Sequence, residues 1–164
     1  MENLLTVGYE GATLPAFLAT LRAAGVTTLL DVRELPLSRR QGFSKRALAE
    51  ALAEVGITYQ HERELGSPKN IRNQLRADGD YAQYFASFKT YLKLQQPLLR
   101  DLAASLEGSV ALMCFERDPS TCHRSVVAKH LEKLTGLTVR HLGVNHVAGL
   151  QRARHHSGQG VSAA

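Results

Sequence analysis

The sequence predicts a three-layer, Rossmann-like α/β fold with a mostly parallel five-stranded sheet and helices on both faces. Short aliphatic and β-branched runs alternate with segments of helical period along the chain, which is typical of repeated β-α units. The run 109–116 (SVALMCFE) is the most apolar of these, as expected for a central parallel strand covered on both sides. The length of 164 residues fits one domain, which we expect over 1–145, followed by a mobile basic tail over 146–164.

The predicted elements alternate in the order that this fold requires. In the first helix, Phe17 and Leu21 share one face, and Gly25 is a suitable residue to end it. Ser44 can cap the second helix, in which Leu48, Leu52 and Val55 share one apolar face. Strands are predicted over 3–9, 26–32, 56–61, 109–116 and 137–142, and helices over 13–25, 45–56, 80–95, 96–108 and from about 119 or 126 to 136.

Two segments in the middle of the chain are harder to assign. The segment 62–80 is polar, carries basic residues beside Pro68, and is predicted as a surface loop that includes at most a short helix. The helix over 80–95 carries several aromatic residues at helical spacing, and we expect them to belong to the core rather than to a base-stacking surface. These aromatic residues are Tyr81, Tyr84, Phe85 and Phe88.

The composition favours an anionic partner and argues against a membrane or disulfide-rich protein. The net charge is +5 and the basic residues cluster in 33–46 and 63–76, which favours phosphate-bearing ligands. No apolar run approaches the ~20 residues that cross a bilayer, and the N-terminus does not resemble a signal peptide. We therefore expect a cytoplasmic protein with no membrane contact, in which the two cysteines form no structural disulfide.

Polar side chains follow every predicted strand at the point where the strand ends. The carboxyl ends of parallel strands meet at one edge of the sheet, and ligands of open α/β sheets bind outside that edge. We therefore expect these side chains to converge on one site. They are Tyr9 and Glu10, Asp31 and Arg33, His61, Cys114 and Glu116, and His141.

The stretch after the fourth strand holds both cysteines and leads into the last helix. Asp118 before Pro119 predicts a helix that starts there, and an alternative start has Ser125 as the cap. In the first case Cys122 and His123 face the sheet, since apolar residues follow four positions later. In both cases the helix N-terminus and the planar fork of Arg124 suit an anion.

Three roles are open for the cysteines. Cys122 near a helix N-terminus has the setting of a nucleophilic thiolate, although position 128 is alanine where a cysteine phosphatase loop needs an arginine. Cys114, Cys122 and His123 could also hold a metal, with Glu116 or His61. In the third case the thiols fill the core, and this is the simplest interpretation of Cys114. From the sequence we expect no bound metal and no cofactor.

Four ordered motifs resemble those of a known family. They are VGYEG, DVRELPLSRRQGFSK, GITYQHERELGSP and CFERDPSTCHRSVVA, within 6–142. The sequence resembles the bacterial domain-of-unknown-function family 488, and the resemblance implies a small cytoplasmic α/β domain without implying a particular reaction. The match singles out residues in each motif. They are Tyr9, Glu10 and Gly11; Asp31, Arg33, Pro36, Ser38, Gly42, Phe43, Ser44 and Lys45; Tyr59, His61, Leu65 and Gly66; and Cys114, Glu116, Cys122, His123 and Arg124.

Taken together, these features predict an enzyme that acts on a phosphate-bearing substrate, a nucleotide or a nucleic acid, at the carboxyl edge of the sheet. The alternatives are a non-catalytic nucleic-acid-binding module and a metal- or redox-responsive Cys/His domain. The predicted catalytic residues are Glu10, Asp31, His61, Glu116, Cys122 and His123. The predicted anion-binding residues are Tyr9, Arg33, Arg39, Lys45 and Arg124.

Overall fold

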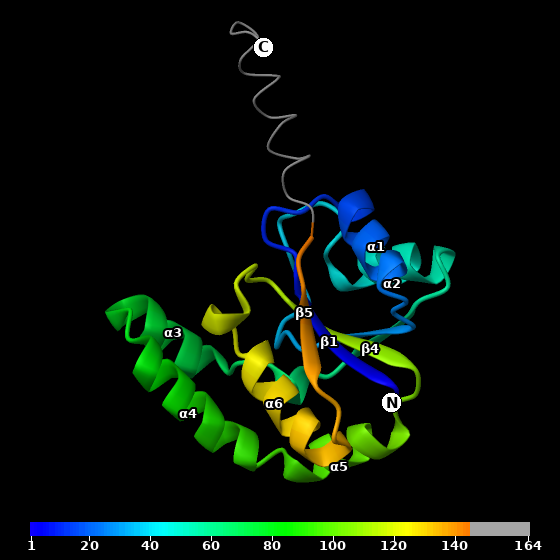
Figure 1. Ribbon diagram of the computed structural model, residues 1–164. Coiled ribbons are helices and arrows are strands. Elements are labelled where there is room, and N and C mark those ends of the chain that lie inside the picture. Colours follow the sequence, from blue (N-terminus) through cyan, green and yellow to red (C-terminus); the bar gives the residue numbers. More distant parts are fainter. Residues whose placement is uncertain (145–164) are drawn as a thin grey trace, which may run out of the picture.

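The computed structural model describes residues 1–144, which form one parallel sheet flanked by helices (Figure 1). The strand order is β3-β2-β4-β1-β5, and every adjacent pair runs parallel. This confirms the predicted fold class. The tail predicted over 146–164 lies outside the described residues. The strands are β1 (Asn3–Gly8), β2 (Thr28–Asp31), β3 (Thr58–His61), β4 (Ser109–Cys114) and β5 (Val139–Leu142).

Helices cover both faces of the sheet and make three layers (Figure 1). One face packs against α1 (Leu14–Ala23) and α2 (Lys45–Glu54). The other face packs against α4 (Tyr81–Lys93), α5 (Gln96–Ser105) and α6 (Arg124–Thr135). Another helix, α3 (Lys69–Asp78), packs on α4 rather than on the sheet, and two 3₁₀ turns, η1 (Arg63–Leu65) and η2 (Pro119–Thr121), complete the described chain.

The central strand β4 divides the core into two halves. Its residues alternate between the two faces, as the pleat of a strand requires. Leu112 and Cys114 pack on the α6 side, whereas Ala111 and Met113 pack on the α1 and α2 side. All six residues of β4 are buried, so the position predicted from its apolar sequence is correct. The alternation turns the Cys114 side chain toward α6.

The segment predicted as a surface loop contains a complete helix, α3. It follows Pro68, which supplies the first accepting carbonyl, and it ends at Gly79, whose φ of 65° is left-handed. None of its residues is buried, so the periodic apolar signal of a core helix is weak there. The prediction of at most a short helix was therefore an underestimate, because α3 is stabilised by its caps and by packing on α4.

The stretch before α6 follows neither of the two predicted starts. Asp118 caps only the 3₁₀ turn η2, where its Oδ1 accepts a hydrogen bond of 2.9 Å from the Ser120 amide. Cys122 then has an extended backbone, with φ −123° and ψ 139°, and the α-helix begins at Arg124. This break in the helical path still turns the Cys122 and His123 side chains into the interior, as predicted.

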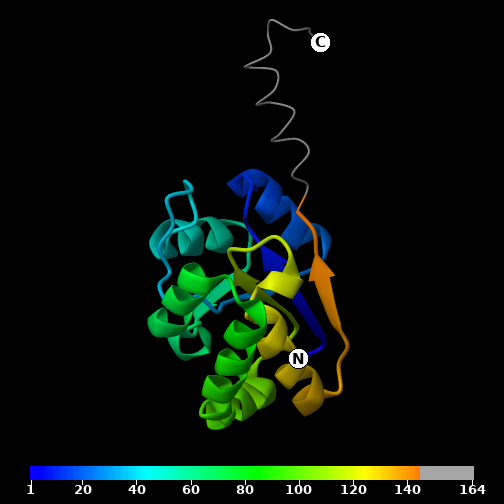
Figure 2. The same ribbon diagram turned by 90° about the vertical axis from the view of Figure 1, so that its left-hand side faces the viewer.

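The segments after β2 and after β4 both lie on the side of the carboxyl ends of the strands (Figure 2). The strand register places the residues from which these segments start side by side. Cys114 pairs with Gly8 of β1, and Asp31 pairs with Met113 of β4 and with His61 of β3. Within 1–144, no helix is both long and apolar enough to span a bilayer.

Candidate functional site

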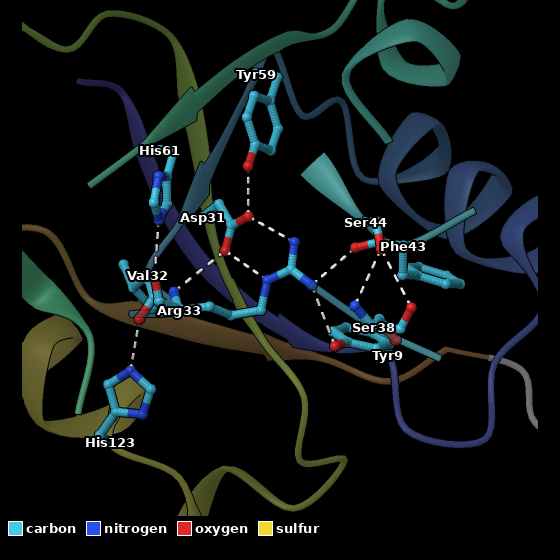
Figure 3. A network of polar contacts seen from close by, with 10 residues as sticks. All are labelled: Tyr9, Asp31, Val32, Arg33, Ser38, Phe43, Ser44, Tyr59, His61 and His123. Atoms are coloured by element: carbon cyan, nitrogen blue, oxygen red, sulfur yellow. Dashed lines mark hydrogen bonds and ion pairs between the residues drawn. The ribbon is translucent and has the colours of Figure 1, made fainter. Parts of the chain in front are cut away.

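The exit of β2 carries a buried ion pair between Asp31 and Arg33 (Figure 3). The guanidinium Nε donates to Asp31 Oδ1 at 2.9 Å and Nη2 donates to Oδ2 at 2.7 Å, so the pair is bidentate. The remaining nitrogen, Nη1, donates to the Phe43 carbonyl at 2.8 Å and to the Tyr9 hydroxyl at 3.2 Å. The Tyr59 hydroxyl donates to Asp31 Oδ2 at 2.6 Å. We call these five residues the Arg33 cluster.

Every guanidinium nitrogen of Arg33 has a hydrogen-bond acceptor in the Arg33 cluster, which ties the loop after β2 to the sheet. Burial alone disfavours the charged guanidinium, but hydrogen bonding and attraction to Asp31 outweigh it and raise the pKa of Arg33. Burial and the same carboxylate also raise the pKa of Tyr59. The Tyr9 ring stacks on the Phe43 ring with centroids 4.5 Å apart. These contacts leave Arg33 little capacity to hold a ligand, and give it the role of a structural anchor.

The exit of β4 carries a second buried cluster. His123 Nδ1 lies 3.8 Å from the Sγ atoms of both Cys114 and Cys122. Its other ring nitrogen, Nε2, donates to the Val32 carbonyl at 2.7 Å (Figure 3). Glu116 stands beside these groups, and its Oε2 is buried without a hydrogen-bond partner among residues 1–144. We call Cys114, Glu116, Cys122 and His123 the Cys–His cluster.

Burial, hydrogen bonds and the charges of neighbouring groups shift the pKa of each residue in the Cys–His cluster. Burial opposes ionisation of Cys122, but its hydrogen bond to Cys114 and the charge of His123 outweigh it and hold the pKa of Cys122 well below its usual value. The hydrogen bond to Cys122, followed by burial, raises the pKa of Cys114. Burial and the charge of Cys122 raise the pKa of Glu116 to about 7. In His123, burial disfavours the charged ring, but the Cys122 thiolate raises its pKa.

A pocket of about 530 Å³ opens between the two clusters and the α3–α4 pair. Cys114, Glu116 and His123 line it on the β4 side, and Tyr9 and Arg33 line it on the β2 side. The other walls come from the loop after β2, from α3, α4 and the loop before α3, and from the segment after β4. They include Glu34, Leu35, Leu37, Ser38, Ser67, Arg72, Leu75, Arg76, Tyr81, Tyr84, Phe115 and Thr121.

Arg124 lies beneath the pocket and supports the loop that carries Glu116. It is fully buried, and its Nη1 donates to the Glu116 carbonyl at 2.5 Å while Nη2 reaches the Arg117 carbonyl at 3.4 Å. Its Nε has no partner within the described chain. From the other side, Glu10 accepts a hydrogen bond of 2.9 Å from the Arg117 amide. Both residues therefore position the 116–117 loop and do not face the pocket.

The structure brings together some of the predicted site residues and separates others. Tyr9, Arg33, Glu116 and His123 line the pocket, while Asp31 and Cys122 lie buried directly behind it. His61 Nε2 donates to the Arg33 carbonyl at 2.8 Å, outside the pocket lining. His141 of β5 pairs with Thr6, two residues before β1 ends. The residues that line no part of the pocket are Glu10, Arg39, Lys45, His61, Cys122, Arg124, Asp31 and His141.

Several pocket residues were not among those predicted from the sequence. Ser67, whose Oγ is buried without a partner in 1–144, lies in the loop before α3. Arg72 and Arg76 of α3 belong to a basic cluster visible in the sequence, at a spacing of one helical turn. Tyr81 and Tyr84 were expected in the core. Tyr84 is nearly buried but reaches the pocket, and Tyr81 is 47% exposed at its mouth.

The fold and the pocket define a small parallel α/β protein with a ligand-sized site at the carboxyl edge of its sheet. The model of the family described as "Domain of unknown function DUF488" matches residues 13–131, well over half of the chain. The chain belongs to this family, in agreement with the resemblance seen in its motifs. The searches of curated proteins and of solved structures returned no significant match.

Proposed function

We propose that this protein is an enzyme that acts on a phosphate-bearing substrate of the nucleotide or nucleic-acid class, bound in the pocket at the carboxyl edge. One observation carries the proposal. One pocket is lined by Glu116, whose buried Oε2 has no hydrogen-bond partner among residues 1–144, by exposed apolar rings and by an exposed arginine. A site for such a substrate needs three features: a group that can react, a flat apolar wall and a positive charge.

The apolar wall supports a ligand with a flat, weakly polar part. Six large hydrophobic side chains are exposed in the part of the chain that the structure describes. Four of the six line this pocket, so the exposure is concentrated and not scattered. Tyr81 and Phe115 offer aromatic faces, and stacking of a base on such a face contributes about 1–3 kcal/mol. The four residues are Leu35, Leu37, Tyr81 and Phe115.

The rim supports a negatively charged part on the same ligand. Arg76 is exposed, and within the described residues its side chain makes one long contact, of 3.4 Å, to Asn73 Oδ1. Its guanidinium is therefore free to bind a phosphate in a planar fork. Arg72 is already held by Glu34 at 2.7 Å and by the Ser67 carbonyl, so it shapes the wall and adds positive charge. Together these groups make Arg76 the first candidate for phosphate binding.

Glu116 is the group best placed for proton transfer. Glu116 lines the pocket, and the hydrogen-bonding capacity of its buried Oε2 is not used by residues 1–144, which supports a role as general acid or base. His123 and Cys114 also line the pocket, whereas Cys122 is 1% exposed behind them. A nucleophilic role therefore fits Cys122 less well than the sequence suggested. A cytoplasmic location, where thiols remain reduced, fits two free cysteines.

The test uses the full chain, a panel of nucleoside 5′-monophosphates and a short single-stranded DNA. Binding is followed by calorimetry and turnover by chromatography of the products. We expect Arg76→Gln to weaken binding about tenfold, because one phosphate contact is lost. We expect Glu116→Gln to bind the same ligand and to lose turnover about 10²-fold or more, because proton transfer contributes at least that much.

The matched control is Arg22→Gln, since Arg22 is an exposed arginine in the last turn of α1 and lies outside the pocket. It should behave like the wild type. The proposal would be contradicted if Arg76→Gln left the affinity for every ligand in the panel unchanged. Salt-sensitive DNA binding without turnover of any ligand, unchanged in Glu116→Gln, would favour the non-catalytic nucleic-acid-binding module instead.

A further inference from the structure

The floor of the pocket holds a set of three metal-ligating side chains. The Sγ atoms of Cys114 and Cys122 and one ring nitrogen of His123 all lie within 4.8 Å of one another, and all three side chains are buried. Two of them line the pocket. We propose that Cys114, Cys122 and His123 bind a zinc ion, with its fourth coordination position open to the pocket. This inference goes beyond the proposed function and does not depend on it.

The distances are those that a tetrahedral zinc site requires. A zinc ion with a Zn–S bond of about 2.3 Å and a Zn–N bond of about 2.0–2.1 Å holds sulfur and nitrogen roughly 3.6 Å apart. His123 Nδ1 lies 3.8 Å from each of the two sulfur atoms. Each sulfur–nitrogen distance therefore needs to shorten by only about 0.2 Å. The two sulfur atoms, which a tetrahedral ion holds roughly 3.8 Å apart, lie within 4.8 Å of each other.

The histidine presents the correct nitrogen to the sulfurs. His123 Nε2 lies 2.7 Å from the Val32 carbonyl oxygen, which can only accept a hydrogen bond (Figure 3). Nε2 therefore carries a proton, so once the ring is neutral, as metal binding requires, its lone pair is on Nδ1, the nitrogen that lies beside Cys114 and Cys122. Ligand histidines in metal sites have this same arrangement, in which a backbone carbonyl fixes the tautomer and the ring orientation.

The donor set selects the class of ion. Two thiolates and an imidazole are ligands for zinc and for soft ions, whereas Mg²⁺ and Ca²⁺ need oxygen ligands. Two thiolate charges also balance one divalent ion, which makes the buried site neutral overall. The fold provides the three ligands from two separate places, the end of β4 and the two residues immediately before α6.

The open position follows from which ligands reach the pocket. Cys114 and His123 line its wall, and Cys122 lies behind them, so the fourth corner of the tetrahedron faces the pocket. Three protein ligands with an open position are the pattern of catalytic zinc sites, and four are the pattern of structural ones. Ligand exchange at that position gives the ion a route into the buried cluster.

The test is a cobalt titration of the full chain after treatment with chelator and reductant. Thiolate ligation of Co²⁺ gives a sulfur-to-metal charge-transfer band, which histidines alone cannot produce. We expect the band to saturate at about one ion per chain and zinc to displace the cobalt. Cys114→Ser, Cys122→Ser and His123→Gln should each weaken binding more than the ~10–100-fold typical of losing an outer partner. The control His130→Gln, on α6 but outside the pocket, should bind as the wild type does.

A second measurement needs no variant and so does not depend on whether the variants fold. Zinc should slow alkylation of both cysteines in the native wild-type chain by about tenfold or more, since both sulfurs become ligands. The proposal is overturned if zinc leaves the alkylation rates unchanged and cobalt gives no sulfur band. A disulfide between Cys114 and Cys122 would also overturn the proposal. It would be seen as a mass two hydrogen atoms below that of the reduced chain, in protein that was purified under reducing conditions and binds no cobalt.

Discussion

The two clusters at the carboxyl edge both contain buried ionisable groups, but they differ in how far these groups are hydrogen-bonded. The Arg33 cluster and the Cys–His cluster both place buried ionisable groups directly after a strand, β2 in one case and β4 in the other. In the first, Asp31 and Arg33 satisfy each other and their neighbours. In the second, Glu116 keeps an oxygen without a partner in the described chain, and two sulfurs share one imidazole nitrogen. Unmet bonding capacity, and not burial or charge, therefore distinguishes the cluster that we propose acts on a ligand.

The largest expected effect tests the structural side of this comparison. Replacing Arg33 by Met leaves the Asp31 carboxylate buried without its counter-ion, which costs about 3–5 kcal/mol in the free energy of unfolding. Urea denaturation measures the loss. Arg22→Met, at an exposed position on α1, serves as the control and should change the free energy by less than about 0.5 kcal/mol. A loss below about 1 kcal/mol for Arg33→Met would show that the cluster does not hold the fold.

A smaller effect is expected at the outer edge of the Arg33 cluster. Tyr59→Phe removes the hydrogen bond of 2.6 Å to Asp31 Oδ2, and we expect a loss of about 1–2 kcal/mol, since the acceptor is charged and the site is half-buried. Tyr91→Phe is the matched comparison, because its hydroxyl donates at 2.7 Å to the uncharged Glu64 carbonyl. It should cost less than Tyr59→Phe in the same urea experiment. The reverse order would mean that charge adds nothing to the Asp31 contact.

The smallest effect is expected in the Cys–His cluster. Glu116→Gln keeps the side-chain shape and removes a buried carboxyl for which the described chain provides no partner at Oε2, so stability should stay within about 0.5 kcal/mol. Ser67→Ala tests the same idea with a second buried atom of this kind, and should also be nearly neutral. Urea unfolding of both variants provides the measurement. A loss above about 2 kcal/mol in Glu116→Gln would make Glu116 a structural residue and remove the contrast between the clusters.

The sequence predicted the fold and the edge of the sheet because both depend on local pattern. The apolar run of β4 and the polar residues that follow it are visible in one dimension, and parallel pairing then places Cys114 near Gly8 and Asp31 near Met113. The register follows from burial of alternate residues on both faces.

The division of roles at that edge could not be predicted, because it depends on partners far apart in the chain. Arg33 and Arg124 both looked suited to an anion, yet Arg33 is committed to Asp31 and Phe43, and Arg124 to the carbonyl of Glu116. The α3–α4 wall was missed for a related reason. Tyr81 has the period of a core residue, and only the packing of α3 on α4 beside the sheet edge turns it toward a pocket.

The Val32 carbonyl lies between the two residues of the ion pair and receives the His123 hydrogen bond (Figure 3). The peptide that holds the imidazole proton in place is thus clamped on either side by Asp31 and Arg33. Loss of the Asp31–Arg33 ion pair would therefore loosen the Val32 carbonyl, and the His123 ring could then change its tautomer. Substitution of Asp31 or Arg33 is therefore expected to affect both the stability of the fold and the orientation of His123.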